Sequence, residues 1–264
     1  MTAEPESVRV HKPQGDDRRL RFAMLGLRVC KSIFWHDRSK PFPKPIRGAS
    51  CFIVNIRGRY IGVTASHVVD LFRDARRANP ETICQIMHAT IDLEDNLISQ
   101  SKRRDIATFN VPSELVDEGL RPGILHYQDW PPPEPVKGAL TMFVGFPESM
   151  RTITGPSDLQ LMAWAGLEIV EDVTSREIIM AYDPTRSRSM LDNQGLLPPT
   201  FNLSGCSGGP ALIFEPKNDV LEVYASGVIT DGPNEGSTGA FAEIAVIHAA
   251  RLDCMTAEGI IATE

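Results

Sequence analysis

A proline-rich run near the middle of the chain, Trp130-Pro-Pro-Pro-Glu-Pro135, constrains the fold more than any other feature. Proline fixes the backbone angle φ and lacks an N–H donor, so the run favours an extended connector over a helix or a central strand. We therefore expect a linker at residues 129–138, between a first lobe at 21–128 and a second lobe at 139–264. Residues 1–20 are rich in charge and contain proline and glycine, which predicts a flexible N-terminal arm.

Short β-rich segments separated by glycine and proline clusters lie on both sides of this connector. In the first half, Cys51–Ile56 and Tyr60–Val69 are typical of a hairpin that turns at Arg57-Gly58-Arg59. In the second half, strand signals recur at 139–145, 159–169, 177–182, 211–214, 220–230 and 240–244. Many short strands with turn signals favour barrels or sandwiches over a sheet in which strands and helices alternate.

Composition narrows the class of protein. The 264 residues can bury a sizeable core, and 42% apolar with 23% charged residues is ordinary for a globular protein. A net charge of −7 argues against a nucleic-acid-binding protein, and no segment is long and apolar enough to span a membrane. The N-terminus lacks the apolar stretch of a secretory signal. Five cysteines without a CxxC pair indicate free thiols, with neither a disulfide framework nor a zinc site, so we expect a cytoplasmic protein.

Two residues before the connector are candidates for catalysis. His67 ends the run Thr64-Ala-Ser-His67, which follows a strand-like segment and precedes a short helix expected at Asp70–Asn79. Asp105 opens the strand-like segment Asp105–Val111. Taken singly, a histidine is usually structural or exposed, and an aspartate before a strand is usually a turn residue. Each gains weight only in combination with the other and with a nucleophile.

The strongest single motif is Gly205-Cys-Ser207-Gly-Gly-Pro210. A nucleophilic serine needs an exposed Oγ, and it needs backbone N–H groups aimed at the oxyanion that develops during attack. Glycines on both sides allow the tight, open backbone that this requires. A plain glycine-rich loop between strands explains the motif equally well when it is taken alone.

The order of the three candidates along the chain supports a common role. His67 and Asp105 precede the connector, and Ser207 follows it. A cleft between two lobes would then receive a base and its orienting carboxylate from one lobe and the nucleophile from the other. Histidine, aspartate and serine in this order can form a Ser-His-Asp triad, in which histidine activates the serine and aspartate holds the histidine.

These three segments resemble those of the trypsin/chymotrypsin-like serine peptidases, in particular the bacterial trypsin-like and HtrA-type branches, over residues 48–245. The resemblance implies an all-β, chymotrypsin-like fold of two six-stranded antiparallel β-barrels. To this we add a short C-terminal helix, expected at Glu243–Cys254, and no PDZ domain. The implied activity is that of a serine endopeptidase, with a protein or peptide as substrate and with no metal or organic cofactor. A protein partner that activates or inhibits the enzyme is a further possibility.

The resemblance also assigns the site. The catalytic residues are His67, Asp105 and Ser207, and the backbone N–H groups of Gly205 and Ser207 form the oxyanion hole. The hydroxyl of Thr230 is expected to hydrogen-bond Asp105. The substrate pocket is formed by Phe201, Thr230, Asp231, Gly232, Gly239 and Phe241. We expect this pocket to accept small or apolar side chains, unless the Asp231 carboxylate turns into it.

The chain departs from the family at the residue before the nucleophile. Cys206 stands where members activated by cleavage of their N-terminus carry an aspartate, so we do not expect that mode of activation, and we expect Cys206 itself to be a packed thiol. Two alternatives stay open. One is a latent or degenerate peptidase-fold protein that binds peptides or protein partners without cutting them. The other is an esterase-type hydrolase with a GxSxG motif, for which His248 is the histidine late enough in the chain.

Overall fold

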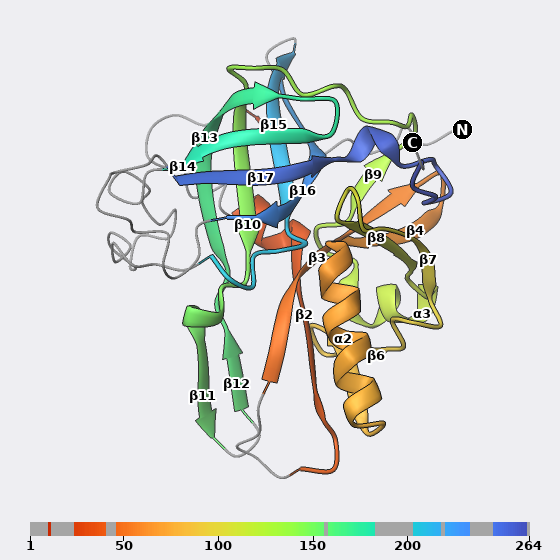
Figure 1. Ribbon diagram of the computed structural model, residues 1–264. Coiled ribbons are helices and arrows are strands. Elements are labelled where there is room, and N and C mark those ends of the chain that lie inside the picture. Colours follow the sequence, from red (N-terminus) through yellow and green to blue (C-terminus); the bar gives the residue numbers. More distant parts are fainter. Residues whose placement is uncertain are drawn as a thin grey trace.

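The computed structural model describes residues 10–11, 24–40, 46–155, 158–182, 203–217, 220–232 and 245–262. These residues form two large antiparallel sheets and one small hairpin (Figure 1). The closed barrel occupies the upper part of the view, and the other large sheet lies below it together with the long helix α2. The architecture is therefore mostly β, rich in barrel-like sheets and compatible with chymotrypsin-like folds.

The first sheet has the strand order β6-β5-β2-β3-β4-β8-β7, and β9 pairs with β3 in parallel. Its strands are β2 (Cys30–Asp37), β3 (Ile46–Ile56), β4 (Arg59–Thr64), β5 (Thr82–Ile86), β6 (Ala89–Ile91), β7 (Leu97–Ser101), β8 (Ile106–Asn110) and β9 (Leu125–Tyr127). β3 and β4 form the expected hairpin across Arg57 and Gly58, which both have positive φ. In β5 buried and half-buried residues alternate, which is the pattern of a strand with one face on a core.

This first sheet is a half-barrel: among the described residues, β6 and β7 at its two ends do not pair with each other. Helix α2 (Ser66–Ala78) packs against β5 and β8, next to those ends. It buries Val68, Val69 and Phe72, which share one face at helical spacing, in the same apolar cluster as Ile33 of β2. The helix thus covers the core at the place where further strand pairing would close the barrel, so the closed first barrel expected from the sequence is not what the described strands form.

The second sheet closes on itself as a six-stranded antiparallel barrel in the order β16-β15-β10-β13-β14-β17, because β17 also pairs with β16. Its strands are β10 (Leu140–Gly145), β13 (Trp164–Val173), β14 (Glu177–Tyr182), β15 (Pro210–Lys217), β16 (Val220–Asp231) and β17 (Ala245–Arg251), and β1 (Val10–His11) is added at the edge of β16. β11 (Arg151–Gly155) and β12 (Asp158–Leu161) form the separate hairpin. Each strand of the closed barrel therefore pairs with two other strands of the barrel, and β16 pairs with β1 as well.

The remaining described helical segments are short. They are the helical residues 24–29, α3 (Ser113–Leu115), the π-helical turn η1 (Val116–Leu120) and the 3-10 turns η2 (Glu148–Met150) and η3 (Leu252–Cys254). Residues 129–138, the expected linker, contain no helix or strand and connect β9 to β10. None of the helices in the described part of the chain has the length and apolar character needed to cross a bilayer.

Two expectations about helices were wrong. The C-terminal helix expected at Glu243–Cys254 is replaced by strand β17, whose residues pair with both β14 and β16, and only Leu252–Cys254 is helical. The first long helix begins at Ser66, four residues before the expected start at Asp70, so β4 ends at Thr64. Backbone pairing in the closed barrel thus prevails over the local helical character of residues 245–251.

An apolar cluster joins the two large sheets. It contains Phe52 and Val54 of β3 together with Val144 of β10, Leu212 of β15 and Val228 of β16, all of them buried. The two sheets therefore share a continuous core. Residues at the ends of β4, β10 and β16 consequently meet along this junction, where the candidate site lies.

Candidate active site at the junction of the two sheets

His67 is placed by the transition from β4 to α2. β4 ends at Thr64, Ala65 has the extended backbone of a helix N-cap, and His67 is the second residue of the helix. The backbone N–H groups in the first turn of a helix have no partner inside that helix. The N–H of His67 donates to Oδ1 of Asp105 at 2.9 Å, so the carboxylate serves as the cap that Ala65 cannot provide.

Asp105 holds the imidazole as well as the backbone of His67. Its Oδ2 lies 2.7 Å from Nδ1 of His67, which donates to it. Asp105 lies between β7 and β8 and has φ of 53°, a left-handed conformation that aspartate tolerates better than most side chains. Because both carboxylate oxygens bind His67, the ring is fixed with Nε2 as its free nitrogen.

The charge distribution around His67 favours its protonated form. The hydrogen bond from Asp105 is the largest cause that raises the pKa of His67 above its ordinary value, and partial burial of the ring opposes it. The negative charges of Asp105, Asp231 and Asp70 raise the pKa further. A base with this pKa is neutral, and able to accept a proton, only above that raised value.

We therefore expect the titration of His67 to have its midpoint above pH 6.5, the ordinary value for histidine. Activity that depends on neutral His67 should fall as the pH drops through this midpoint. The measurement is the pH dependence of the His67 Cε1 proton shift by NMR, which needs no substrate. A midpoint below 6.5 would contradict the influence of the Asp105 hydrogen bond.

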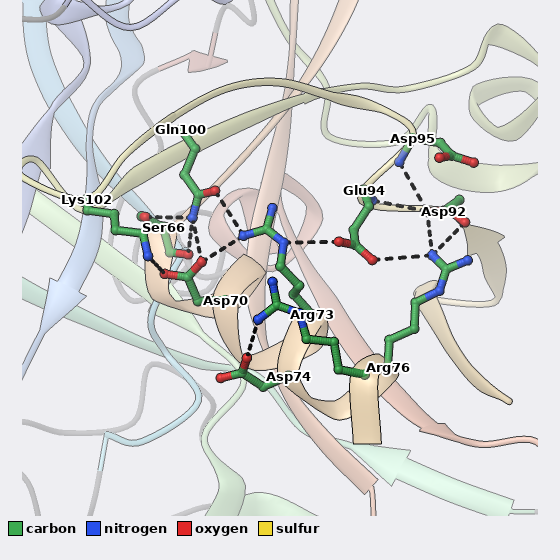
Figure 2. Close-up of polar contacts among 11 residues, drawn as sticks. Ser66, Asp70, Arg73, Asp74, Arg76, Asp92, Glu94, Asp95, Gln100 and Lys102 are labelled. Carbon is green, nitrogen blue, oxygen red and sulfur yellow. Dashed lines mark hydrogen bonds and ion pairs between the residues drawn. The ribbon is translucent and has the colours of Figure 1, made fainter. Parts of the chain in front are cut away.

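A polar network supports the start of α2 from the β7 side (Figure 2). The amide of Gln100 donates to the carbonyl oxygen of Ser66 at 3.1 Å and to Oδ1 of Asp70 at 3.1 Å. Lys102 and Arg73 also pair with Asp70, at 3.1 and 2.9 Å. The peptide between Ser66 and His67 is thus held at its carbonyl by Gln100 and at its N–H by Asp105, two residues contributed by β7 and the turn that follows it.

Ser207 lies in a loop, residues 204–209, whose backbone conformation requires glycine at two positions. We call this segment the nucleophile loop. Gly205 has φ of +94°, and a Cβ there would lie 2.5 Å from the carbonyl oxygen of Phe146. Gly208 has φ of +87°, and a Cβ there would lie 2.1 Å from the carbonyl oxygen of Ser50. The glycines predicted from the motif are therefore required by backbone conformation and by close approach to neighbouring strands.

The backbone amides of this loop divide into two groups. Those of Cys206, Gly208 and Gly209 donate to backbone carbonyls at 2.7 to 2.9 Å. Those of Gly205 and Ser207 find no acceptor among the described residues. The carbonyl before Gly205 accepts a hydrogen bond from the N–H of Glu148 at 2.7 Å, which turns the Gly205 N–H the opposite way. Two neighbouring donors without partners are what an oxyanion requires.

Replacing Glu148 with proline should therefore impair catalysis, because it removes the N–H that holds the carbonyl of Ser204. Proline suits the first position of a helical turn, and Pro147 has φ of −59° and ψ of 141°, the extended backbone that must precede a proline. We expect kcat to fall about tenfold or more, with KM little changed. Glu148→Ala is the matched control, since it loses the ion pair with Arg151 but retains the N–H. Equal kcat values for the two variants would contradict this role.

A pocket of about 330 Å³ joins these elements. His67 and Ser207 both line it, which places the candidate base and nucleophile at one cavity. Its walls are otherwise formed by Phe143, Leu203, Ser204, Cys206, Ile229, Thr230, Asp231 and Gly232. Aromatic and aliphatic side chains on β10 and β16 give the wall an apolar part, and the exposed Asp231 adds a negative charge.

The predicted pocket residues fall into two sets. Thr230, Asp231 and Gly232 line this pocket, whereas Phe201, Gly239 and Phe241 lie outside the described residues. The expected hydrogen bond from Thr230 to Asp105 was wrong, because the Thr230 hydroxyl donates to the carbonyl oxygen of His248 at 3.3 Å.

The alternative nucleophile, Cys206, and the alternative base, His248, lie in surroundings that differ from those of Ser207 and His67. Cys206 is 1% exposed, and burial raises the pKa of its thiol far above its ordinary value, so it is a packed thiol. His248 lies on β17, where its Nδ1 is 3.1 Å from Oε2 of Glu177, and it does not line the pocket of Ser207. The histidine that shares this pocket is His67.

Sequence reasoning missed the residues that hold the nucleophile loop in place. Chief among them is Ser50 of β3, whose N–H donates to the carbonyl oxygen of Ser207 at 2.9 Å. Phe143, Leu203 and Ile229 were also missed as pocket walls. No local motif marks any of these residues, because their contacts join segments far apart in the chain.

The comparison with protein-family models gave no match, and neither did the comparison with curated proteins. Among solved structures, a match comes from work on aromatic interactions that drive the coupled folding and binding of the intrinsically disordered Sesbania mosaic virus VPg protein. It has a TM-score of 0.41 and 12% sequence identity, and it covers 84% of this chain and 85% of that chain. A likeness this weak carries no argument about function.

Proposed function

We propose that this protein is a serine endopeptidase of the trypsin/chymotrypsin-like family, which cleaves a protein or peptide through an acyl-enzyme intermediate. One observation carries the proposal: His67 is fixed by the two hydrogen bonds that it donates to Asp105, and it lines the same pocket as Ser207. A base with a defined free nitrogen that lines one pocket with a serine in a glycine-rich loop supports acyl transfer by that serine, and in this structure Oγ of Ser207 makes no hydrogen bond to His67.

In the proposed reaction, Oγ of Ser207 attacks the carbonyl carbon of the scissile peptide bond, and Nε2 of His67 accepts the hydroxyl proton. His67 then donates this proton to the leaving amine as the carbon–nitrogen bond breaks, which leaves an ester on Ser207. Water attacks the ester with His67 again as the base, and the acid product leaves as Ser207 regains its proton. Asp105 orients the ring and stabilises the imidazolium throughout.

The oxyanion formed in each attack is assigned to the N–H groups of Gly205 and Ser207. Both amides lack an acceptor among the described residues, and the carbonyl before Gly205 is anchored by Glu148. Removing one such donor typically costs about 3–4 kcal/mol in the barrier.

We propose that the residue on the acyl side of the cleaved bond is small or apolar. Phe143, Leu203 and Ile229 are apolar lining residues that are at most 5% exposed, and the pocket volume of about 330 Å³ suits a single side chain. Asp231 is exposed, and its Oδ1 accepts the N–H of Gly232 at 2.8 Å, so its carboxylate is engaged at the backbone.

The test is cleavage of a diverse peptide library followed by mass spectrometry, with the Ser207→Ala variant as the control. We expect internal cleavage by the native chain after small or apolar residues, and none by the variant. Cleavage by both proteins would assign the activity to a contaminant. Cleavage by the native chain only after arginine or lysine would overturn the apolar specificity while leaving the endopeptidase proposal in place.

A further inference from the structure

The inference concerns Ser50, a residue of β3 that belongs neither to the candidate triad nor to the candidate oxyanion hole. Ser50 is 0% exposed. Its hydroxyl donates to the carbonyl oxygen of Gly205 at 2.7 Å and accepts the N–H of Phe146 at 2.9 Å. Its own N–H donates to the carbonyl oxygen of Ser207 at 2.9 Å. One serine of the half-barrel therefore binds the nucleophile loop at two points.

The carbonyl oxygen of Ser50 is also engaged. It accepts the hydroxyl of Thr64 at 2.8 Å, at the end of β4 and three residues before His67. The backbone of Gly208 approaches so closely that a Cβ there would lie 2.1 Å from this carbonyl oxygen and 2.2 Å from Oγ1 of Thr64. Ser50 is thus packed between the strand that leads to the candidate base and the loop that carries the candidate nucleophile.

Gly205 is held on each side by a different residue. The peptide that precedes it is fixed where the N–H of Glu148 binds the carbonyl of Ser204. The peptide that follows it is fixed where the Ser50 hydroxyl binds the carbonyl of Gly205. The Ser50 hydroxyl is in turn anchored by the N–H of Phe146, two residues before Glu148. These contacts lie on both sides of Gly205, which has φ of +94°.

We propose that Ser50 is a positioning residue for the nucleophile loop: its hydroxyl holds Gly205 in the conformation that leaves the Gly205 N–H without an acceptor among the described residues, available to an oxyanion. The inference rests on the proposed peptidase function, and it adds a residue that the triad and the oxyanion hole do not include. Glycine visits many backbone conformations, so Gly205 has no intrinsic preference for this one. Without the hydroxyl, the buried carbonyl of Gly205 and the N–H of Phe146 both lose their hydrogen-bond partner. A change in the loop conformation would let them form new hydrogen bonds.

The test compares Ser50→Ala with Ser226→Ala. Ser226 is a matched control, because it is 2% exposed and its hydroxyl donates at 3.4 Å to the carbonyl oxygen of Ala211 within the closed barrel. Two quantities are measured on the full chain: the rate of labelling by a fluorophosphonate probe, and the NMR shift and hydrogen exchange of the Gly205 amide in glycine-labelled protein. The His67 titration is recorded for each variant.

For Ser50→Ala we expect the labelling rate to fall about tenfold or more, and the Gly205 amide to shift and exchange faster. The His67 midpoint should stay at its native value, because Asp105 and not Ser50 holds the ring. Ser226→Ala should leave all three quantities unchanged. If Ser50→Ala fails to fold, Ser50→Cys is used instead, since the thiol has a similar shape and is a weaker donor.

A folded Ser50 variant with a native Gly205 amide would overturn the proposal, and so would an equal change in Ser226→Ala. The amide measurement does not depend on activity. A native chain that reacts with no probe would therefore count against the peptidase function, while the Gly205 signal would still decide the role of Ser50.

Discussion

Replacing Ser207 with alanine is expected to lower kcat for peptide hydrolysis about a millionfold, because the acyl-enzyme can no longer form. Folding should be unaffected, since the side chain of Ser207 makes no hydrogen bond to the described residues and the residue is only half-buried. The measurement is kcat on a peptide identified in the library screen, with thermal unfolding as the check on folding. Residual cleavage within tenfold of the native rate would mean that another residue is the nucleophile.

The matched comparison for the base is His67→Ala with His248→Ala. The first should lose nearly as much activity as Ser207→Ala, because residues that act as one unit do not contribute additively. The second should retain native activity, because His248 lies outside the pocket and pairs with Glu177. A larger loss for His248→Ala than for His67→Ala would revive the esterase-type arrangement.

Replacing Asp105 with asparagine is expected to lower kcat about 10⁴-fold, as in enzymes whose triad histidine is left in the wrong tautomer. Asparagine is the right substitution, because it nearly preserves the shape of the side chain and tolerates the φ of 53° at this position. It also removes the hydrogen bond that is the largest cause of the raised pKa of His67. The acid limb of the pH profile should therefore move to lower pH.

The control for this pH effect is Asp70→Asn. Asp70 raises the pKa of His67 only through its charge and has a smaller influence than Asp105 or Asp231, so the acid limb should move much less than in Asp105→Asn. The profiles of kcat/KM are compared at constant ionic strength, because screening weakens charge effects. An unchanged acid limb in Asp105→Asn would show that the limb does not report on His67.

The fold was predictable where local pattern and pairing agree. The strand expected at 177–182 is β14, residue for residue, and the turn at Arg57 and Gly58 joins the expected hairpin. Residues 245–251 were assigned wrongly, because alanine and arginine favour helices while pairing with β14 and β16 makes this segment a strand. The half-barrel form of the first sheet could not be predicted from local sequence patterns either, because it involves the packing of α2 next to the unpaired ends of the sheet.

The site was predictable where its residues stand in short motifs. The glycines around Ser207 pointed to an unusual backbone, and positive φ at Gly205 and Gly208 explains them. The role of Ser50 was not predictable, because its hydroxyl binds a carbonyl 155 residues away in the chain and no sequence spacing indicates this contact. The predicted hydrogen bond from Thr230 to Asp105 was wrong for a similar reason. The partner of a hydroxyl depends on which strand lies next to it, and for Thr230 this strand is β17.

The central claim, that Ser207 is a nucleophile activated by His67, is tested most directly by reaction with a fluorophosphonate probe and mass spectrometry of the labelled peptide. Native chain, His67→Ala and Ser207→Ala are treated alike, and the folding of each is checked. Labelling of the native chain at Ser207, with neither variant labelled, is the predicted result. Absence of labelling in a folded native chain, or labelling at a residue other than Ser207, would contradict the claim.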